Sequence, residues 1–177
     1  MTVVDDGKLT YVVQGTYYVS GHPQCSFSTV LGSCISVCLH DPVAAVGGMN
    51  HFLLAAGRGE DSGHIRFGVN AMEKLINELL KAGASRPRLQ AKVFGGARMS
   101  AKLADIGRSN AAFATSFLED EGTPVISKSI GGSDARRVIF WPSTSQARML
   151  LVPSDSVELN EQPPPKAVEH VGAIDMF

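Results

Sequence analysis

Two stretches of sequence decide the fold: TVLGSCISVCLH at residues 29–40 and VGGMNHFLL at residues 46–54. Both are rich in β-branched and other apolar residues that favour strands. Asp41 and Pro42 follow the first stretch with turn chemistry, since an aspartate bonds its own backbone and a proline fixes φ. We therefore predict that the two stretches form a β-hairpin.

Alternate side chains of a strand lie on opposite faces, so the first stretch has two distinct faces. One face carries Ile35, Val37 and Leu39, and the other carries Cys34, Ser36, Cys38 and His40. If the hairpin turn is centred between Pro42 and Val43, Cys34 lies directly opposite His51, with Cβ atoms ~4.5 to 5.5 Å apart. A slip of one residue would move His51 to the other face, and the glycine pair at residues 47–48 is an expected place for a bulge.

A thiol beside an imidazole is the apparatus of nucleophilic catalysis. Free cysteine has a pKa of about 8.5, and a neighbouring imidazolium favours the thiolate. Cys34 could then attack an amide, with His51 handing a proton to the leaving amine. The backbone N–H groups of Gly32, Ser33 and Cys34 could stabilise the oxyanion. Ser28 or Thr29, just upstream, could orient the imidazole or bind the substrate amide.

Outside these stretches, the pattern predicts strands and two amphipathic helices in one domain. We expect strands before residue 21 and at 89–94, 124–129, 136–141 and 147–152, a glycine-rich loop at 55–63, and helices at 69–82 and 110–121. Gly83 is a natural C-terminal cap for the first helix, and Ser109 an N-terminal cap for the second. A change of composition after Pro153 divides the chain into a folded domain, residues 1–153, and a proline-rich tail, residues 154–177.

Composition and charge exclude several classes of protein. The chain has 16 basic and 17 acidic residues, and a nucleic-acid binder would need a basic excess or stripe. No apolar run is long enough to cross a bilayer, and the N-terminus lacks the pattern of a secretory signal, so we expect a cytoplasmic protein that is not inserted in a membrane. Three cysteines, an odd number, argue against a disulfide framework.

A zinc site is the main alternative use of these residues, because Cys34, Cys38 and His40 are close in sequence. On one strand, however, Cys34 and Cys38 would lie ~13 Å apart, too far to share a tetrahedral ion. We therefore expect no metal or other cofactor and interpret Cys38 as a core thiol. Cys25 is expected to be incidental, His40 a turn residue, and His22, His64 and His170 solvated residues of loops or the tail.

The residues resemble the CheD family of chemoreceptor glutamine deamidases. The resemblance rests on STVLGSCISVCLHDP, VGGMNHFLL, AKVFGGARM, IGRSN and IGGSDARRVIFWP, in that order, and covers residues 27–152. It implies that Cys34 is the nucleophile and His51 the general base. The third member is a hydroxyl residue six positions before the cysteine, usually threonine; here it is Ser28, with Thr29 beside it.

The resemblance also implies the fold and the substrate. The fold would be a layered α/β arrangement, a mixed β-sandwich flanked by helices, akin to cysteine deamidases among bacterial toxins. The substrates would be glutamines on the helical cytoplasmic region of methyl-accepting chemotaxis receptors, which are converted to glutamates with release of ammonia. Some members of the family bind a CheC-type phosphatase, which makes such a phosphatase a possible partner.

Two other classes of function stay open at the level of sequence. A non-catalytic adaptor could bind receptors or the phosphatase without turning over, although an adaptor has no physical need for the pair Cys34 and His51. A thiol peptidase or transglutaminase-like enzyme would use the same chemistry on other acyl groups.

Overall fold

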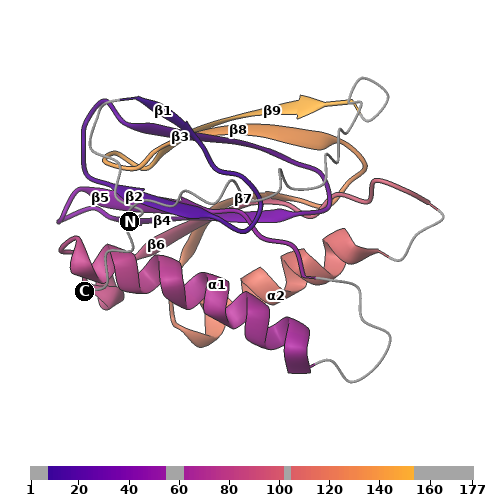
Figure 1. The fold of residues 1–177 in the computed structure, drawn as a ribbon, viewed down its shortest axis with the longest axis horizontal. Coiled ribbons are helices and arrows are strands. Elements are labelled where there is room, and N and C mark those ends of the chain that lie inside the picture. The colour runs from indigo at the N-terminus through magenta and orange to yellow at the C-terminus, as the bar shows by residue number, and fades with distance from the viewer. Residues whose placement is uncertain (1–7, 55–61, 102–104, 154–177) are drawn as a thin grey trace, which may run out of the picture.

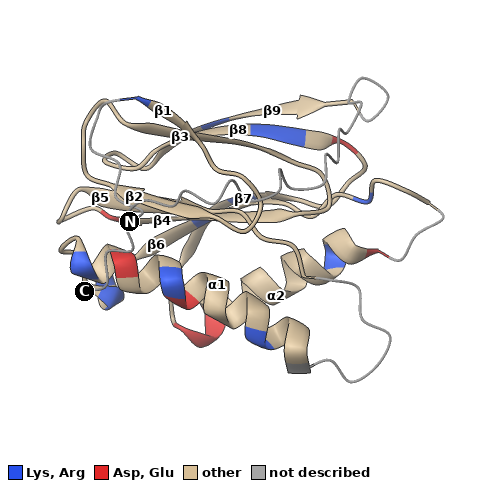
Figure 2. Cartoon of the chain, in the orientation of Figure 1, with Lys and Arg blue, Asp and Glu red and all other residues tan. Residues whose placement is uncertain are grey.

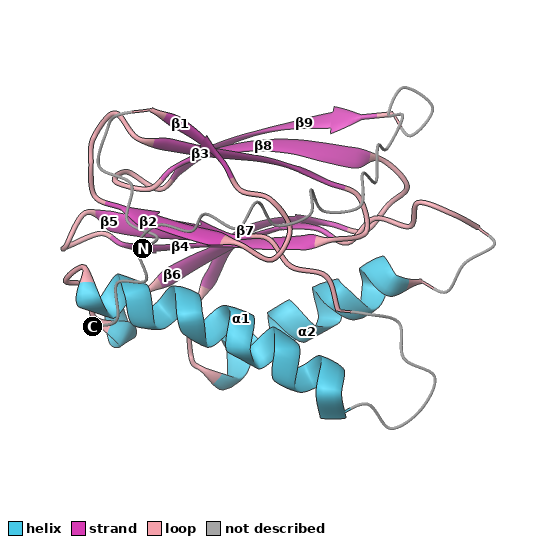
Figure 3. Ribbon diagram, viewed as in Figure 1, coloured by secondary structure: helices cyan, strands magenta, loops and turns pink. Residues whose placement is uncertain are grey.

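A computed structural model describes residues 8–54, 62–101 and 105–153. They form three layers: a four-stranded β-sheet, a five-stranded β-sheet packed against it, and two helices that cover the free face of the five-stranded sheet (Figures 1 and 3). The predicted layered α/β architecture with flanking helices is confirmed.

Both sheets draw strands from distant parts of the chain. The four-stranded sheet has the order β1-β3-β8-β9 and the five-stranded sheet the order β2-β5-β4-β6-β7. The strands are β1 Leu9–Tyr11, β2 Tyr17–Ser20, β3 Ser26–Leu31, β4 Ile35–Asp41, β5 Val46–Asn50, β6 Gln90–Gly95, β7 Val125–Ile130, β8 Ala135–Trp141 and β9 Gln146–Val152. The pairs β1/β3 and β6/β7 are parallel and the other pairs antiparallel, so the sandwich is mixed, as expected.

The stretch at residues 29–40 is not one strand, and here the prediction is wrong. Its first part belongs to β3 of the four-stranded sheet and its second part to β4 of the five-stranded sheet. Residues 32–34 carry the chain from one sheet to the other. Cys34 therefore lies in a turn between the two layers, where a side chain can be reached from outside, rather than within a strand.

The hairpin β4–β5 is present, but its register differs from the prediction. Asp41 pairs with Val46 and Cys38 with Met49, so the turn is centred between Val43 and Ala44. Ile35 and Phe52 continue this register as a single bridge. In it Cys34 and His51 are diagonal neighbours rather than direct partners. The shift is two residues, which leaves both on the same face of the sheet.

A longer turn explains the shift. Residues 42–45 connect the strands, with Asp41 Oδ1 accepting the backbone N–H groups of Val43 and Ala44, as expected of an aspartate that starts a turn. Ala45 has a φ of 52°, a left-handed conformation that is rare for alanine and that its sequence does not announce.

The expected bulge at Gly47 and Gly48 is absent, because both glycines pair in unbroken register with β4. They serve close packing instead. A Cβ on Gly47 would lie 2.4 Å from the carbonyl oxygen of Pro142, and one on Gly48 would lie 2.7 Å from Cδ1 of Leu75. The pair lets the loop after β8 and a helix approach the two faces of β5.

Helix α1, Ser62–Lys81, begins seven residues before the predicted start at residue 69. Its buried side is built from residues at helical spacing that pack on the five-stranded sheet: Met72, Leu75, Ile76 and Leu79. Charges of both signs lie along its outer side (Figure 2). Gly83 follows with a φ of 101°, as expected of a glycine that ends a helix. The predicted loop at 55–63 lies mostly outside the described residues.

Helix α2, Ile106–Asp120, also begins earlier than predicted. Its N-terminal cap is Asp105, whose carboxylate accepts the backbone N–H of Arg108, and the predicted cap Ser109 lies inside the first turn. The aromatic pair Phe113 and Phe117 is one turn apart, with ring centroids 6.1 Å from each other.

The layers enclose two apolar clusters. One, between the five-stranded sheet and the helices, includes Ile35, Val37 and Leu39. The other, between the two sheets, includes Phe27, Cys38 and Phe140. The two faces predicted for residues 35–39 thus point into the two clusters. No helix among the described residues has the length and apolarity needed to span a bilayer. The proposed tail, residues 154–177, lies outside the described residues.

Candidate active site

The turn at residues 32–34, which carries Cys34, is fastened to the loop that follows β6. Gly96 donates its backbone N–H to the carbonyl oxygen of Cys34 at 2.7 Å, and Ala97 donates to that of Gly32 at 2.9 Å. The Cys34 side chain is half-buried. The nucleophile candidate is therefore held by its backbone while its thiol remains accessible.

The glycine pair at the end of β6 makes this attachment possible. Gly95 has a φ of 112°, and a Cβ there would lie 2.2 Å from the carbonyl oxygen of Cys34. Gly96 has a φ of 67°, and a Cβ there would lie 2.7 Å from the carbonyl oxygen of Gly107 on α2. Only glycine lets the backbone of the Cys34 turn, the end of β6 and the start of α2 come this close.

Asn110 on α2 holds the third carbonyl of the turn, and sequence reasoning missed it. Its side-chain Nδ2 donates to the carbonyl oxygen of Ser33 at 2.8 Å, while Oδ1 accepts the backbone N–H of Leu54 at 2.8 Å. It is fully buried. A fully polar side chain among the alanines and phenylalanines of a helix is the signal that could have marked it, because buried amides need partners.

With its carbonyls bound inward, the turn presents its N–H groups to the opposite side. In a trans peptide the N–H is antiparallel to the preceding C=O. Since the carbonyls of Gly32 and Ser33 point into the protein, the N–H groups of Ser33 and Cys34 point away from it. This is the orientation that an oxyanion-binding pair requires.

His51 follows β5 and is nearly buried, with 8% of its surface exposed. Its Nδ1 lies 2.9 Å from Oγ1 of Thr29 and 3.1 Å from the carbonyl oxygen of Val12. The Thr29 hydroxyl also lies 2.8 Å from that carbonyl. Imidazole, hydroxyl and carbonyl thus form a closed triangle of contacts between β3, β5 and the segment after β1.

These contacts decide which nitrogen carries the proton. The Val12 carbonyl oxygen can only accept, so the Thr29 hydroxyl donates its single proton to that oxygen. The hydroxyl oxygen of Thr29 can then only accept a hydrogen bond from His51. All three contacts are satisfied when Nδ1 of His51 is protonated. In the neutral ring Nε2 then holds a lone pair, and Nε2 is buried with no hydrogen-bond partner within the described residues. A general base has this form.

Burial lowers the pKa of His51 below its ordinary value of 6.5, and the hydrogen bond to the Val12 carbonyl opposes the shift in part. At neutral pH the imidazole is therefore uncharged. The sulfur of Cys34 lies 3.6 Å from Oε1 of Gln14, to which a thiol can donate. An uncharged imidazole can accept a proton, which is the state that a general base needs before it acts.

The structure brings Thr29, not Ser28, to the imidazole. Phe27 and Thr29 face the space between the sheets, and Ser28 between them faces the other side of β3, because side chains alternate along a strand. Counting six positions back from the cysteine selects Ser28, and the geometry favours its neighbour for the orienting role.

Comparison with known proteins adds the family. The family model described as CheD chemotactic sensory transduction matches residues 54–150. A protein of Cereibacter sphaeroides, named probable chemoreceptor glutamine deamidase CheD, is 46% identical over 183 residues, which cover 100% of this chain and 92% of that protein.

The chain belongs to the CheD family.

Other CheD proteins are similar to this chain over most of its length. One from Caulobacter sp. (strain K31), also named probable chemoreceptor glutamine deamidase CheD, is 52% identical over 94% of this chain and 92% of its own length. A second, numbered CheD 1, from Ruegeria sp. (strain TM1040), is 55% identical over 81% of this chain and 77% of its own. Among solved structures, the hypothetical protein YfiH of Bacillus licheniformis has a TM-score of 0.44 at 13% identity, with 64% of this chain and 49% of that one covered.

The other cysteines and histidines of this CheD chain have structural surroundings. Cys38 lies between the sheets, and burial raises the pKa of its thiol far above the ordinary value, against smaller opposite effects of Lys92 and Ser36. Cys25, expected to be incidental in a loop, is a fully buried core residue. His40 is not a turn residue: it is buried in β4, and its Nδ1 donates to the carbonyl oxygen of Pro142.

The remaining predictions concern metal ligands and the histidines that were expected in loops or in the tail. Among the described residues no cluster of three or more His, Cys, Asp or Glu side chains could hold a metal ion. His22 is half-buried in a turn, where its Nδ1 accepts the backbone N–H of Gln24. His64 lies in the first turn of α1 rather than in a loop, and His170 lies outside the described residues.

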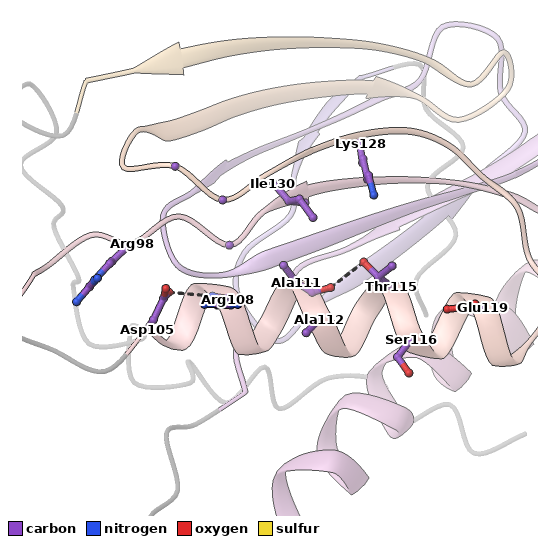
Figure 4. A pocket seen from close by; sticks show the side chains of 13 residues that line it. Arg98, Asp105, Arg108, Ala111, Ala112, Thr115, Ser116, Glu119, Lys128 and Ile130 are labelled. Atoms are coloured by element: carbon purple, nitrogen blue, oxygen red, sulfur yellow. Dashed lines mark hydrogen bonds between the residues drawn. The ribbon is translucent and has the colours of Figure 1, made fainter.

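Two hollows lie near the candidate residues of this CheD chain: one includes His51 in its lining, and the other includes Gly96, which donates to the carbonyl oxygen of Cys34. A small one of about 70 Å³ is lined by His51 together with Tyr17, Phe67 and Lys74. A larger one of about 540 Å³ lies between α2 and β7, where Lys128 and Ile130 point toward the helix (Figure 4). Neither Cys34 nor His51 lines the larger hollow.

Proposed function

We propose that this chain deamidates glutamine side chains of chemotaxis receptors in the cytoplasm, with Cys34 as nucleophile, His51 as general base and acid, and Thr29 as the residue that orients His51. Its relatives are named as probable chemoreceptor glutamine deamidases. The observation that carries the proposal is the unshared lone pair of His51 Nε2, held by the contacts of Nδ1 on the face of the sheet that Cys34 shares.

The first half of the reaction forms a thioester. His51 Nε2 takes the proton of the Cys34 thiol, and the sulfur attacks the carbonyl carbon of the substrate glutamine. The developing oxyanion faces the N–H groups of Ser33 and Cys34. The protonated imidazole then gives its proton to the leaving nitrogen, which departs as ammonia.

The second half restores the enzyme. His51 Nε2 removes a proton from a water molecule, which attacks the thioester, and the sulfur leaves with that proton. The product is a glutamate side chain. On a receptor helix each conversion replaces a neutral amide by a carboxylate and so changes the repulsion between neighbouring helices.

Mass spectrometry of a receptor cytoplasmic fragment tests the proposal. The wild type should release ammonia and convert glutamines, seen as the small mass gain of exchanging NH2 for OH. Cys34→Ala should lower the rate on the order of 10³-fold or more, because the substitution removes the nucleophile. Cys38→Ala is the matched control, a second thiol only four residues away, and should keep most of the activity.

The same measurement separates the other classes of function. New chain ends would indicate a peptidase, and no product with any variant would indicate an adaptor that binds receptors or a CheC-type phosphatase. Deamidation by Cys34→Ala at the wild-type rate would refute the role of this cysteine.

A further inference from the structure

A turn of the chain places one of its own glutamines at the nucleophile. Residues 13–16 form a tight turn, closed by the N–H of Thr16 donating to the carbonyl oxygen of Val13 at 3.0 Å. The turn is fastened to His51 on both sides: Gly15 donates to the carbonyl oxygen of His51 at 2.7 Å, and the N–H of His51 donates to that of Thr16 at 3.1 Å. Gln14 at its tip is thus fixed relative to the base.

The Gln14 side chain reaches the sulfur while remaining exposed. Its Oε1 accepts the Cys34 thiol at 3.6 Å. When His51 removes the thiol proton, Oε1 loses this donor, because a thiolate can only accept. The catalytic step itself therefore frees an acceptor a short distance from the reacting sulfur.

A substrate carboxamide must enter the same space. Its carbonyl carbon has to come within ~3 to 3.5 Å of the sulfur before attack. A group on the same side of the sulfur as Gln14 can then approach within hydrogen-bond distance of Oε1, which lies 3.6 Å from that sulfur. The substrate amide carries N–H groups on its leaving nitrogen, and these are the donors that Oε1 of Gln14 lacks once Cys34 is deprotonated.

We propose that Gln14 recognises the substrate carboxamide, with its Oε1 accepting an N–H of the amide that Cys34 attacks. This inference rests on the proposed deamidase function and adds the residue that distinguishes an amide from a carboxylate. The glutamate product has only acceptor oxygens at neutral pH. Its carboxylate would repel Oε1 of Gln14, which favours release of product over rebinding.

The test compares Gln14→Met with the wild type. Methionine keeps the length of the side chain and lacks the strong acceptor. Gln24→Met is the matched control, since Gln24 is also an exposed glutamine in a turn but lies between β2 and β3. With the receptor cytoplasmic fragment as substrate, Gln14→Met should lower kcat/KM about fivefold, mostly through a higher KM, as the loss of one neutral hydrogen bond predicts. Gln24→Met should change nothing.

Two further measurements exclude a merely structural effect. Methyl methanethiosulfonate, a thiol reagent without an amide, should modify Cys34 at the same rate in the wild type and in Gln14→Met, because the base and the turn are intact. Peptide mass spectrometry of the wild type should show residue 14 still as glutamine.

Each contrary result overturns the inference. Equal kcat/KM in Gln14→Met and wild type would show that Gln14 does not touch substrate. A lower KM together with faster modification of Cys34 would show that Gln14 obstructs the site. Cys34-dependent conversion of residue 14 to glutamate would show that it occupies the substrate position itself. In these three cases the wild type still deamidates the receptor; a wild type that converts no glutamine ends the proposed function and this inference together.

Discussion

Cys34 and Cys38 are four residues apart and have opposite surroundings. Cys38 lies on β4 between the two sheets, with 1% of its surface exposed and a thiol pKa raised by burial. Cys34 lies in the turn before the same strand, half-buried, on the face that His51 shares. One short stretch of sequence thus holds an inert thiol and a candidate nucleophile. We infer that the reactivity of a cysteine in this stretch depends on its position at the crossing between the sheets rather than on the residue type.

We expect the imidazole of His51 to contribute most to the difference in reactivity between the two thiols. His51→Gln keeps an amide nitrogen near the Val12 carbonyl but removes the base, so we expect deamidation to fall on the order of 10² to 10⁴-fold. The reaction of Cys34 with methyl methanethiosulfonate at neutral pH should slow toward that of an ordinary exposed cysteine. Measured on folded protein, an unchanged rate of modification would mean that Cys34 owes nothing to His51, and the comparison of the two thiols would reduce to exposure alone.

The Thr29 hydroxyl supports the imidazole from the other sheet. Thr29→Val keeps the shape of the side chain and removes the acceptor for His51 Nδ1, so we expect activity to fall about tenfold with little change in substrate KM. Ser28→Ala is the matched control on the opposite face of β3 and should leave activity nearly unchanged. The reverse order of effects, measured as kcat on the receptor fragment, would return the third role to Ser28.

How far the sequence predicted this site depends on the range of the interactions. The hairpin, its turn at Asp41 and the alternating faces of β4 follow from local patterns, and the pair Cys34 and His51 was predicted from the hairpin and from the family resemblance. The register did not, because a left-handed Ala45 lengthens the turn without a sequence signal. Cys34 and His51 still lie on the same face of the sheet, as predicted, only because the register shift is an even number of residues.

The parts that the sequence could not supply are contacts between distant segments. Nothing local shows that the stretch before Gly32 changes sheets, that Asn110 on a helix would bind the Ser33 carbonyl, or that Val12 would present a carbonyl to His51. Each of these contacts depends on how the four-stranded sheet packs on the five-stranded sheet. That packing brings Thr29 to His51, whereas counting six positions back from Cys34 selects Ser28.

The acid limb of the pH profile of kcat/KM tests how burial affects His51. Only neutral His51 can act as the base, and its pKa in the folded protein lies below 6.5. We therefore expect kcat/KM to persist below pH 6.5 and to fall only as the pH drops through the lower folded-state pKa, a change of several-fold over about one pH unit. An acid limb above pH 6.5 would contradict the burial of the ring as its main electrostatic environment.

The lowered pKa of His51 also makes the stability of the folded protein depend on pH. Between the folded pKa and 6.5 the unfolded chain binds more protons than the folded one, so stability rises with pH in that window. The contribution of neutral His51 is complete above pH 6.5 and is lost as the pH falls through the folded pKa. Urea unfolding of the wild type and of His51→Gln on both sides of pH 6.5 should show a smaller difference in the variant.

The smallest effect on activity belongs to Cys38, where the comparison predicts a cost to folding alone. Cys38→Ala leaves a small gap between the sheets, beside Phe94 and Met49 of the same apolar cluster, and should lower the free energy of unfolding by about 1 kcal/mol. Its kcat should match the wild type, because Cys38 is a core residue between the sheets and is not among the residues whose hydrogen bonds hold His51 or the Cys34 turn. A loss of kcat larger than the loss of folded protein would show that the two thiols are coupled through β4, and that Cys34 depends on the inter-sheet core as well as on its own turn.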